Sequence, residues 1–212
     1  AMSGVSFWGY DLGGFYNTGY IGNEERPNIE DYLSSVQMGL WMPLSRAHGK
    51  TPREPWQYGD MALKEVKKWI NFRHRLVPYL YHTACQSHQS GIPMIRPLVM
   101  EYPKDPIAKI QNLSYMLGDA LLISPGFDRD EYELYLPEGR WQDIESKEVY
   151  EGMTFVHIEN KAFADGGTSL RVFQKEGTSI PLFAQKEVLH VPAQLWKQED
   201  LEFMTFQKKD VD

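Results

Sequence analysis

Two polar side chains follow short apolar runs of this chain, and they are of the types that bind the hydroxyl groups of a sugar. Asp11 ends the run that begins at Val5, and His48 lies just past a second run that begins at Trp41. If both runs are strands of one parallel barrel, the two side chains project from its carboxyl-terminal face into one pocket. A carboxylate accepts hydrogen bonds and an imidazole donates or accepts them, so the pair suits adjacent hydroxyls.

An aromatic residue completes this hypothesis. Phe15 follows Asp11 after two glycines, and its ring can lie against a sugar ring while the glycines let the backbone approach closely. Each residue also has a purely structural interpretation, because an aspartate at a strand end often caps a helix or anchors a loop. A lone histidine beside arginine and glycine is commonly a surface or packing residue. The residue types alone leave both interpretations open.

Other chemistry finds little support in the sequence. Cys85 falls near His82 and His88 on one expected helix, a grouping that we attribute to chance rather than to metal binding. The serines lack the Gly-x-Ser-x-Gly setting of a nucleophile elbow, and residues 9–14 do not form a dinucleotide-binding loop. We therefore expect neither a metal ion nor a cofactor.

The composition argues against several partners. The 212 residues carry a net charge of -7, so no basic stripe is available for nucleic acid. No apolar run approaches the ~20 residues that span a bilayer, and no signal peptide is present, so we expect no membrane partner. The single Cys85 excludes an internal disulfide and favours a reducing compartment. A cytoplasmic location is the expectation, although the chain is not taken to begin at a natural N-terminus.

Residues 1–90 are expected to be α/β. Apolar runs at residues 5–8 and 41–45 predict short strands, and apolar residues at helical spacing predict a helix over residues 29–40. A long helix is predicted over residues 62–89, with Pro78 as a kink and Gly91 as the stop. Strand, helix, strand, helix is the order of β/α units in a parallel sheet.

From residue 91 the pattern changes to short strands separated by turns. Strands are predicted at residues 94–100, 120–124, 132–136 and 170–173, with turns at residues 137–139, 165–167 and 176–178. One short helix is expected at residues 106–117. This spacing favours an antiparallel β-sandwich.

A series of longer motifs carries a family resemblance. The chain contains, in unbroken order, the segments FWGYDLGGF, MPLSRAHGKTPREPW, FRHRLVPYLY, GIPMIRPLVMEYPKD, YMLGDALLISP and YLPEGRW. From residue 2 to about residue 183 the sequence resembles glycoside hydrolase family 31, which contains α-glucosidases, α-xylosidases and relatives, and most of all its bacterial members. The resemblance implies the last part of a (β/α)₈ TIM barrel at residues 1–90, a proximal antiparallel β-sandwich at residues 91–185, and a tail or the start of a distal β domain at residues 186–212.

The resemblance also implies a function. It indicates part of a retaining α-glycosidase that hydrolyses terminal non-reducing α-linked glucose or xylose from an oligosaccharide or α-glycoside substrate. Asp11 matches the acid of the family motif F-W-x-x-D-[IL]-G-G-F, and Phe15 matches its closing aromatic. The histidine of S-R-x-H matches His48, which is implied to bind hydroxyls of the sugar in the cleaved subsite. Arg46 would support the pocket by pairing with a carboxylate such as Asp11, and Trp8 is a second supporting residue.

The family's nucleophile and acid/base aspartates come earlier in the barrel, and no residue here matches either. We therefore expect the chain alone to be inactive. We also expect the rest of the barrel, or another chain, against the open edge of residues 1–90, where Phe7, Trp8, Trp41 and Met42 would face solvent or that partner. Family members of α-xylosidase type often carry histidine where this chain has Tyr10, so glucoside or xyloside preference stays open. A second hypothesis is a non-catalytic carbohydrate-binding or scaffolding piece.

Overall fold

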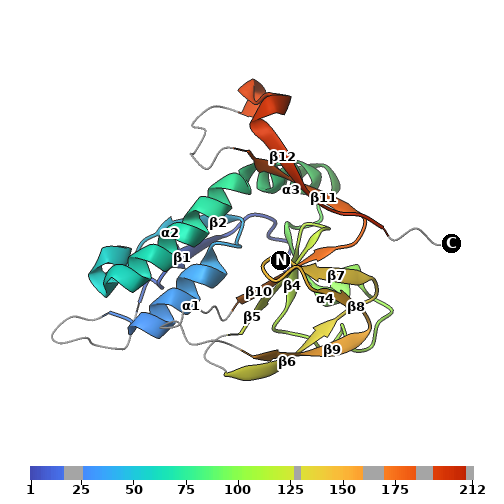
Figure 1. The fold of residues 1–212 in the computed structure, drawn as a ribbon, viewed down its shortest axis with the longest axis horizontal. Coiled ribbons are helices and arrows are strands. Elements are labelled where there is room, and N and C mark those ends of the chain that lie inside the picture. Colours follow the sequence, from blue (N-terminus) through green and yellow to red (C-terminus); the bar gives the residue numbers. More distant parts are fainter. Residues whose placement is uncertain (17–25, 127–129, 160–169, 185–192, 209–212) are drawn as a thin grey trace.

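The computed structural model describes residues 1–16, 26–126, 130–159, 170–184 and 193–208 (Figure 1). Its helices are α1 (Ile29–Gly39), α2 (Asp60–Arg75), α3 (Val77–Ser90) and α4 (Leu98–Glu101), with 3₁₀ turns η1 (Pro55–Tyr58), η3 (Ala193–Leu195) and η4 (Gln198–Asp200). Its strands are β1 (Gly9–Leu12), β2 (Leu44–Ala47), β3 (Ile95–Pro97), β4 (Tyr115–Leu117), β5 (Leu121–Pro125), β6 (Glu131–Leu136), β7 (Arg140–Asp143), β8 (Val149–Glu151), β9 (Thr154–Glu159), β10 (Leu170–Lys175), β11 (Thr178–Phe183) and β12 (Leu201–Phe206). The turn expected at residues 165–167 lies outside the described residues, as does most of the loop between β1 and α1.

Strands β1 and β2 form a parallel pair joined by helix α1, which confirms the predicted strand–helix–strand order. The Asn28 side chain caps α1 by accepting a hydrogen bond from the Asp31 backbone N–H at 2.8 Å. Both strands begin later than predicted. Residues 5–8 do not form a strand, although the Trp8 carbonyl accepts a hydrogen bond from the Leu44 N–H of β2 at 3.3 Å. Residues 41–43 continue the turn that ends α1, with the Met42 N–H bonded to the Gly39 carbonyl. Asp11 therefore lies within β1 rather than after it.

The long helix predicted over residues 62–89 is instead two helices, α2 and α3, separated at Leu76. Pro78 lies in the first turn of α3, where a missing N–H leaves no helix hydrogen bond unmade. Gly91 ends α3 in the left-handed conformation at φ 75°, as predicted. The proline therefore begins a new helix rather than kinking a single one.

Strands β3, β4, β5, β10, β7 and β8 form one antiparallel sheet in that order, and its central strand β5 is buried on both faces. Alternate residues of β5 show this, because Leu121 and Ile123 pack with helices α1 to α3 while Leu122 packs under the ribbon made by β6 and β9. Figure 1 shows helices α1 and α2 on one side of this sheet and the β6–β9 ribbon on the other. The antiparallel sandwich predicted for this part of the chain is confirmed.

The helix predicted at residues 106–117 is wrong. The Asp105 carboxylate accepts hydrogen bonds from the Ile107 and Ala108 N–H groups, and residues 106–110 form only turns. Residues 115–117 then form β4 between β3 and β5. Leu117 is buried in the core that the sheet shares with the helices, and Met116 in the core under the β6–β9 ribbon. This burial outweighs the helical spacing that the segment shows in isolation.

Of the four apolar residues expected to face solvent or a partner, Phe7, Trp8, Trp41 and Met42, two are instead buried within this chain. Trp41 and Met42 are only 2% and 5% exposed, because helix α2 covers them. The Trp41 ring lies 5.6 Å from the ring of Phe72 on that helix. Trp8 is partly buried against the same core, and Phe7 is 47% exposed. None of the helices in the described part of the chain is long and apolar enough to cross a bilayer.

The outer face of the β6–β9 ribbon carries a histidine among glutamates. His157 Nδ1 lies 2.9 Å from Glu133 Oε1, and its Nε2 lies 3.6 Å from Glu131 Oε2. The hydrogen bond to Glu133, with the charges of Glu131 and Glu159, raises the pKa of His157 above its ordinary value. A raised pKa means that protonated His157 stabilises the fold, and that this contribution is complete below the unfolded pKa of about 6.5.

We therefore expect His157→Gln to lower the free energy of unfolding at about pH 5.5 and to have a smaller effect at about pH 9, after the imidazole has lost its proton in both states. Urea unfolding of wild type and variant across this range measures the difference. His82→Gln on α3 is the control, because the exposed His82 has no ion pair with a described residue. An equal loss at both pH values would contradict the role of the charged pair.

Candidate functional site

The ends of β1 and β2 bring two of the predicted site residues into direct contact. Asp11 and Arg46 are opposite one another in the parallel register, so their side chains leave the sheet on the same side. Arg46 Nε donates a hydrogen bond to Asp11 Oδ1 at 2.6 Å, which is the pairing that the sequence predicts. Asp11 Oδ2 makes no hydrogen bond to any described residue. This oxygen is therefore available to accept a hydrogen bond from a ligand.

The loops that follow the two strands bring the other predicted pair together. The ring centroids of Phe15 and His48 are 5.1 Å apart, with the planes tilted by 41°. A backbone hydrogen bond joins the loops, from the Lys50 N–H to the Phe15 carbonyl at 3.0 Å. The His48 ring is exposed and has no hydrogen bond to a described residue, so both of its nitrogens can bind a ligand. Trp8 lies before β1, where its buried indole N–H also lacks a partner among the described residues.

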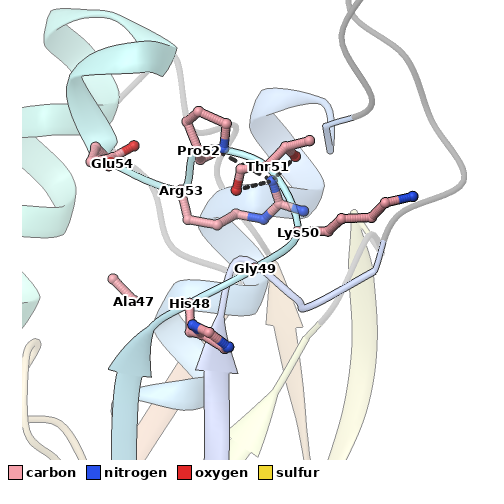
Figure 2. Close-up of a pocket in the computed structure, with 8 residues that line it drawn as sticks. All are labelled: Ala47, His48, Gly49, Lys50, Thr51, Pro52, Arg53 and Glu54. Carbon is pink, nitrogen blue, oxygen red and sulfur yellow. Dashed lines mark hydrogen bonds between the residues drawn. The ribbon is translucent and has the colours of Figure 1, made fainter.

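The loop after β2 lines an open pocket of about 320 Å³, formed by residues 47–54. Figure 2 shows His48 at the end of the strand, with the loop rising from it to Glu54. The lining is mostly polar, with an imidazole, an ammonium group, a hydroxyl, a guanidinium and a carboxylate. Such a lining suits a ligand with many hydroxyl groups and does not suit an apolar one.

Arg53 is a residue of this loop for which the sequence predicts no role. Its side chain is buried at 4% exposure, and its Nε donates to the Gly14 carbonyl of the loop after β1 at 2.9 Å. The signal for it was weak, because an arginine between two prolines in the segment TPREP carries no periodic pattern. Only its place five residues after His48 in the segment MPLSRAHGKTPREPW could have identified it.

A pair of stacked tyrosines lies behind this loop. The rings of Tyr32 on α1 and Tyr58 in η1 are 3.9 Å apart and nearly parallel. The Tyr32 hydroxyl donates to the Arg53 carbonyl at 2.8 Å, and burial raises the pKa of that hydroxyl. Tyr32 therefore stays neutral and keeps its proton for this hydrogen bond across the ordinary pH range.

The arrangement can bind hydroxyl groups and a flat ring. Carboxylate, imidazole and guanidinium groups supply the hydrogen bonds, and Phe15 supplies an aromatic face. Within the described ranges, no three side chains of histidine, cysteine, aspartate or glutamate come close enough to hold a metal ion.

Two family models match the chain. Residues 1–83 match the model described as the glycosyl hydrolases family 31 TIM-barrel domain, and residues 91–187 match that of the glycosyl hydrolase family 31 C-terminal domain. Neutral alpha-glucosidase AB of Mus musculus is 33% identical in an alignment that covers 85% of this chain and 18% of that protein. A 1,6-alpha-glucosyltransferase of Sporosarcina globispora is 32% identical over 82% of this chain and 14% of its own length.

A solved structure shows the same fold. The GH31 dextranase of Flavobacterium johnsoniae, complexed with glucose, aligns with a TM-score of 0.75 and 31% identity over 86% of this chain and 22% of that one. The present chain therefore spans less than a quarter of the length of each of these three proteins. The match to the TIM-barrel model at residues 1–83 includes the strands and loops that carry the candidate site.

Gly13, in the loop after β1, packs closely against Tyr32 of α1 and Arg53 of the loop after β2. It has φ 81°, and a Cβ atom there would lie 2.8 Å from the Tyr32 ring and 3.0 Å from Arg53 Cδ. We expect Gly13→Ala to lower the free energy of unfolding by about 2–4 kcal/mol, the sum of a left-handed backbone and an overpacked contact. Gly91→Ala is the matched control, because Gly91 has φ 75° with nothing within 4 Å, and should lose only about 1–2 kcal/mol. Equal losses in urea unfolding would show that the contact is unimportant.

Proposed function

The chain belongs to glycoside hydrolase family 31, and from this premise we propose that it forms one wall of the sugar site of a retaining α-glycosidase. The proposed substrates are oligosaccharides or other glycosides with a terminal non-reducing α-linked glucose or xylose. The observation that carries the proposal is the presence of two contacting pairs, Asp11 with Arg46 and Phe15 with His48, at the carboxyl ends of two parallel strands and in the loops that follow them. In TIM-barrel enzymes this end of the strands holds the active site.

Each of the four side chains has a part in the proposal. Asp11 Oδ2 accepts a hydrogen bond from a sugar hydroxyl, while Arg46 holds the other carboxylate oxygen in place. His48 binds hydroxyls of the sugar in the cleaved subsite, and the Phe15 ring beside it lies against the sugar. Trp8 supports β1 from the core side.

We propose that the two catalytic carboxyl groups lie outside this chain. A retaining glycosidase needs two carboxyl groups about 5–5.5 Å apart, one as nucleophile and one as acid/base. We propose that both belong to another part of a longer protein, consistent with the small share of its relatives' length that this chain spans. Relatives include a hydrolase and a glucosyltransferase, which differ in whether water or a sugar accepts the glycosyl group. The side chains proposed here contact the donor sugar in hydrolysis and in glycosyl transfer alike. For this protein we propose hydrolysis.

The first test removes the imidazole of His48 from the full-length protein that contains this chain. Loss of a hydrogen bond to a substrate hydroxyl in a closed pocket costs about 1–3 kcal/mol. Such contacts strengthen as the sugar ring distorts, so His48→Ala should lower kcat/KM by roughly tenfold to a hundredfold and lower kcat as well. His82→Ala, on the exposed side of α3, is the control and should leave the kinetics unchanged. Wild-type kinetics for a folded His48→Ala variant would refute the assignment of the site.

The second test concerns the 212-residue chain alone. Without a nucleophile and an acid/base it should not hydrolyse aryl α-glucosides or α-xylosides, since the covalent route is then absent. It should still bind the sugar weakly through the wall described above, which calorimetry or ligand-observed NMR can measure. Turnover that survives rigorous purification and falls in the Asp11→Ala variant would overturn the proposed division of labour. A chain that binds sugar in its natural full-length form without any turnover would favour a carbohydrate-binding module.

A further inference from the structure

We infer that Arg53 is a positioning residue for the sugar site and that it sets the spacing of Phe15 and His48. The inference rests on the proposed function, because those two rings are the groups proposed to hold the sugar. Arg53 itself is buried and is proposed to touch no ligand. Its effect is exerted through the two loops that carry the rings.

The guanidinium of Arg53 spans the gap between the loops. Nε donates to the Gly14 carbonyl, one residue before Phe15. Nη1 donates to Thr51 Oγ1 at 2.6 Å, and also to the Thr51 and Pro52 carbonyls, each at 3.1 Å (Figure 2). Only a forked donor can reach both loops at once, since these bonds leave two different nitrogen atoms.

Close backbone contacts surround Arg53 on the side of Gly49. A Cβ atom on Gly49, next to His48, would lie 2.9 Å from Arg53 Nε and 3.1 Å from the Gly14 carbonyl oxygen. On the opposite side, the Arg53 carbonyl accepts the hydrogen bond from Tyr32 of α1. The residue is thus fixed to α1 through its backbone and to both loops through its side chain.

The charge of Arg53 has no carboxylate partner among the described residues. All of its hydrogen bonds go to uncharged oxygens of Gly14, Thr51 and Pro52. A buried charge without an opposite charge is unfavourable for stability unless its hydrogen bonds compensate. We infer that Arg53 is kept for the geometry that it imposes on the two loops rather than for the stability of an ion pair.

The first measurement uses the 212-residue chain without any ligand. Because the Phe15 ring lies beside the His48 ring, its ring current should shift the His48 ring-proton resonances. Arg53→Lys keeps the charge but cannot reach both loops, so it should move those resonances toward the values seen in Phe15→Ala. Thr51→Val, a milder change that replaces the hydroxyl acceptor by a methyl group, should move them in the same direction by less. Arg96→Lys is the matched control, since Arg96 is a buried arginine that also donates to a carbonyl, that of Pro93 in the sandwich.

The second measurement is a double-mutant cycle in the full-length protein. Arg53→Lys should lower kcat/KM about tenfold in the wild-type background and less than about threefold in the His48→Ala background, because it acts through His48. A role in stability alone would give the same factor in both backgrounds, corrected for folded protein, and would overturn the inference. Arg96→Lys should have no effect on kcat/KM in either background.

The outcomes separate the two proposals. If His48→Ala has wild-type kinetics, the proposed function fails, while a shift of the His48 resonances in Arg53→Lys would still support the positioning role. If His48→Ala is impaired but neither Arg53→Lys nor Thr51→Val changes the resonances or the kinetics, the inference about Arg53 fails and the proposed function stands. If Arg53→Lys does not fold, Thr51→Val decides by the same two measurements.

Discussion

The parallel register of β1 and β2 is the constraint on which the candidate site depends. It places Asp11 opposite Arg46 and Leu12 opposite Ala47, and so fixes where the two following loops begin. Side chains alternate between the faces of a strand, so a slip of one residue would put Arg46 on the face away from Asp11. The pair has to be aligned from outside, because four residues of parallel ladder offer few hydrogen bonds of their own. Helix α1 and the contacts around it supply that alignment.

A partly buried guanidinium, that of Arg73, holds the turn before β2, as Arg53 holds the loop after it. Arg73 on α2 donates to the carbonyls of Leu40, Met42 and Pro43, which form the turn between α1 and β2. Burial lowers the pKa of Arg73 to about 10, so it remains charged at neutral pH. The carbonyl end of a helix favours a cation, which offsets part of the cost of burying one there. Strand β2 is thus held at both ends by arginine side chains that bind backbone oxygens.

Local patterns predicted the elements but not the contacts that hold them in place. The helical spacing of apolar residues such as Leu33 and Val36 located α1 to within about a residue, and the Arg46 pairing with Asp11 followed from the motif resemblance. The helix predicted at residues 106–117 failed because residues 115–117 pair with β3, about 20 residues earlier in the chain, and periodicity within the segment carries no information on such a contact. Arg53 and Arg73 were missed for a related reason. Their partners are backbone carbonyls, which every residue possesses, so the sequence around those partners carries no signal.

The antiparallel sandwich contributes to the site through the helices that it supports. Helices α2 and α3 share one hydrophobic core with β5, β10 and β11, so the helix that carries Arg73 packs on the sheet as well as on β2. Polar contacts fix the same interface, since the Tyr79 hydroxyl donates to the Leu117 carbonyl at 2.6 Å and Arg75 Nε donates to the Phe183 carbonyl at 3.0 Å. Gly118 shows how close this approach is, because a Cβ atom there would lie 2.4 Å from the Tyr79 hydroxyl oxygen. The position of β2, and with it that of His48, is therefore set by residues of the sheet that lie outside the proposed sugar site.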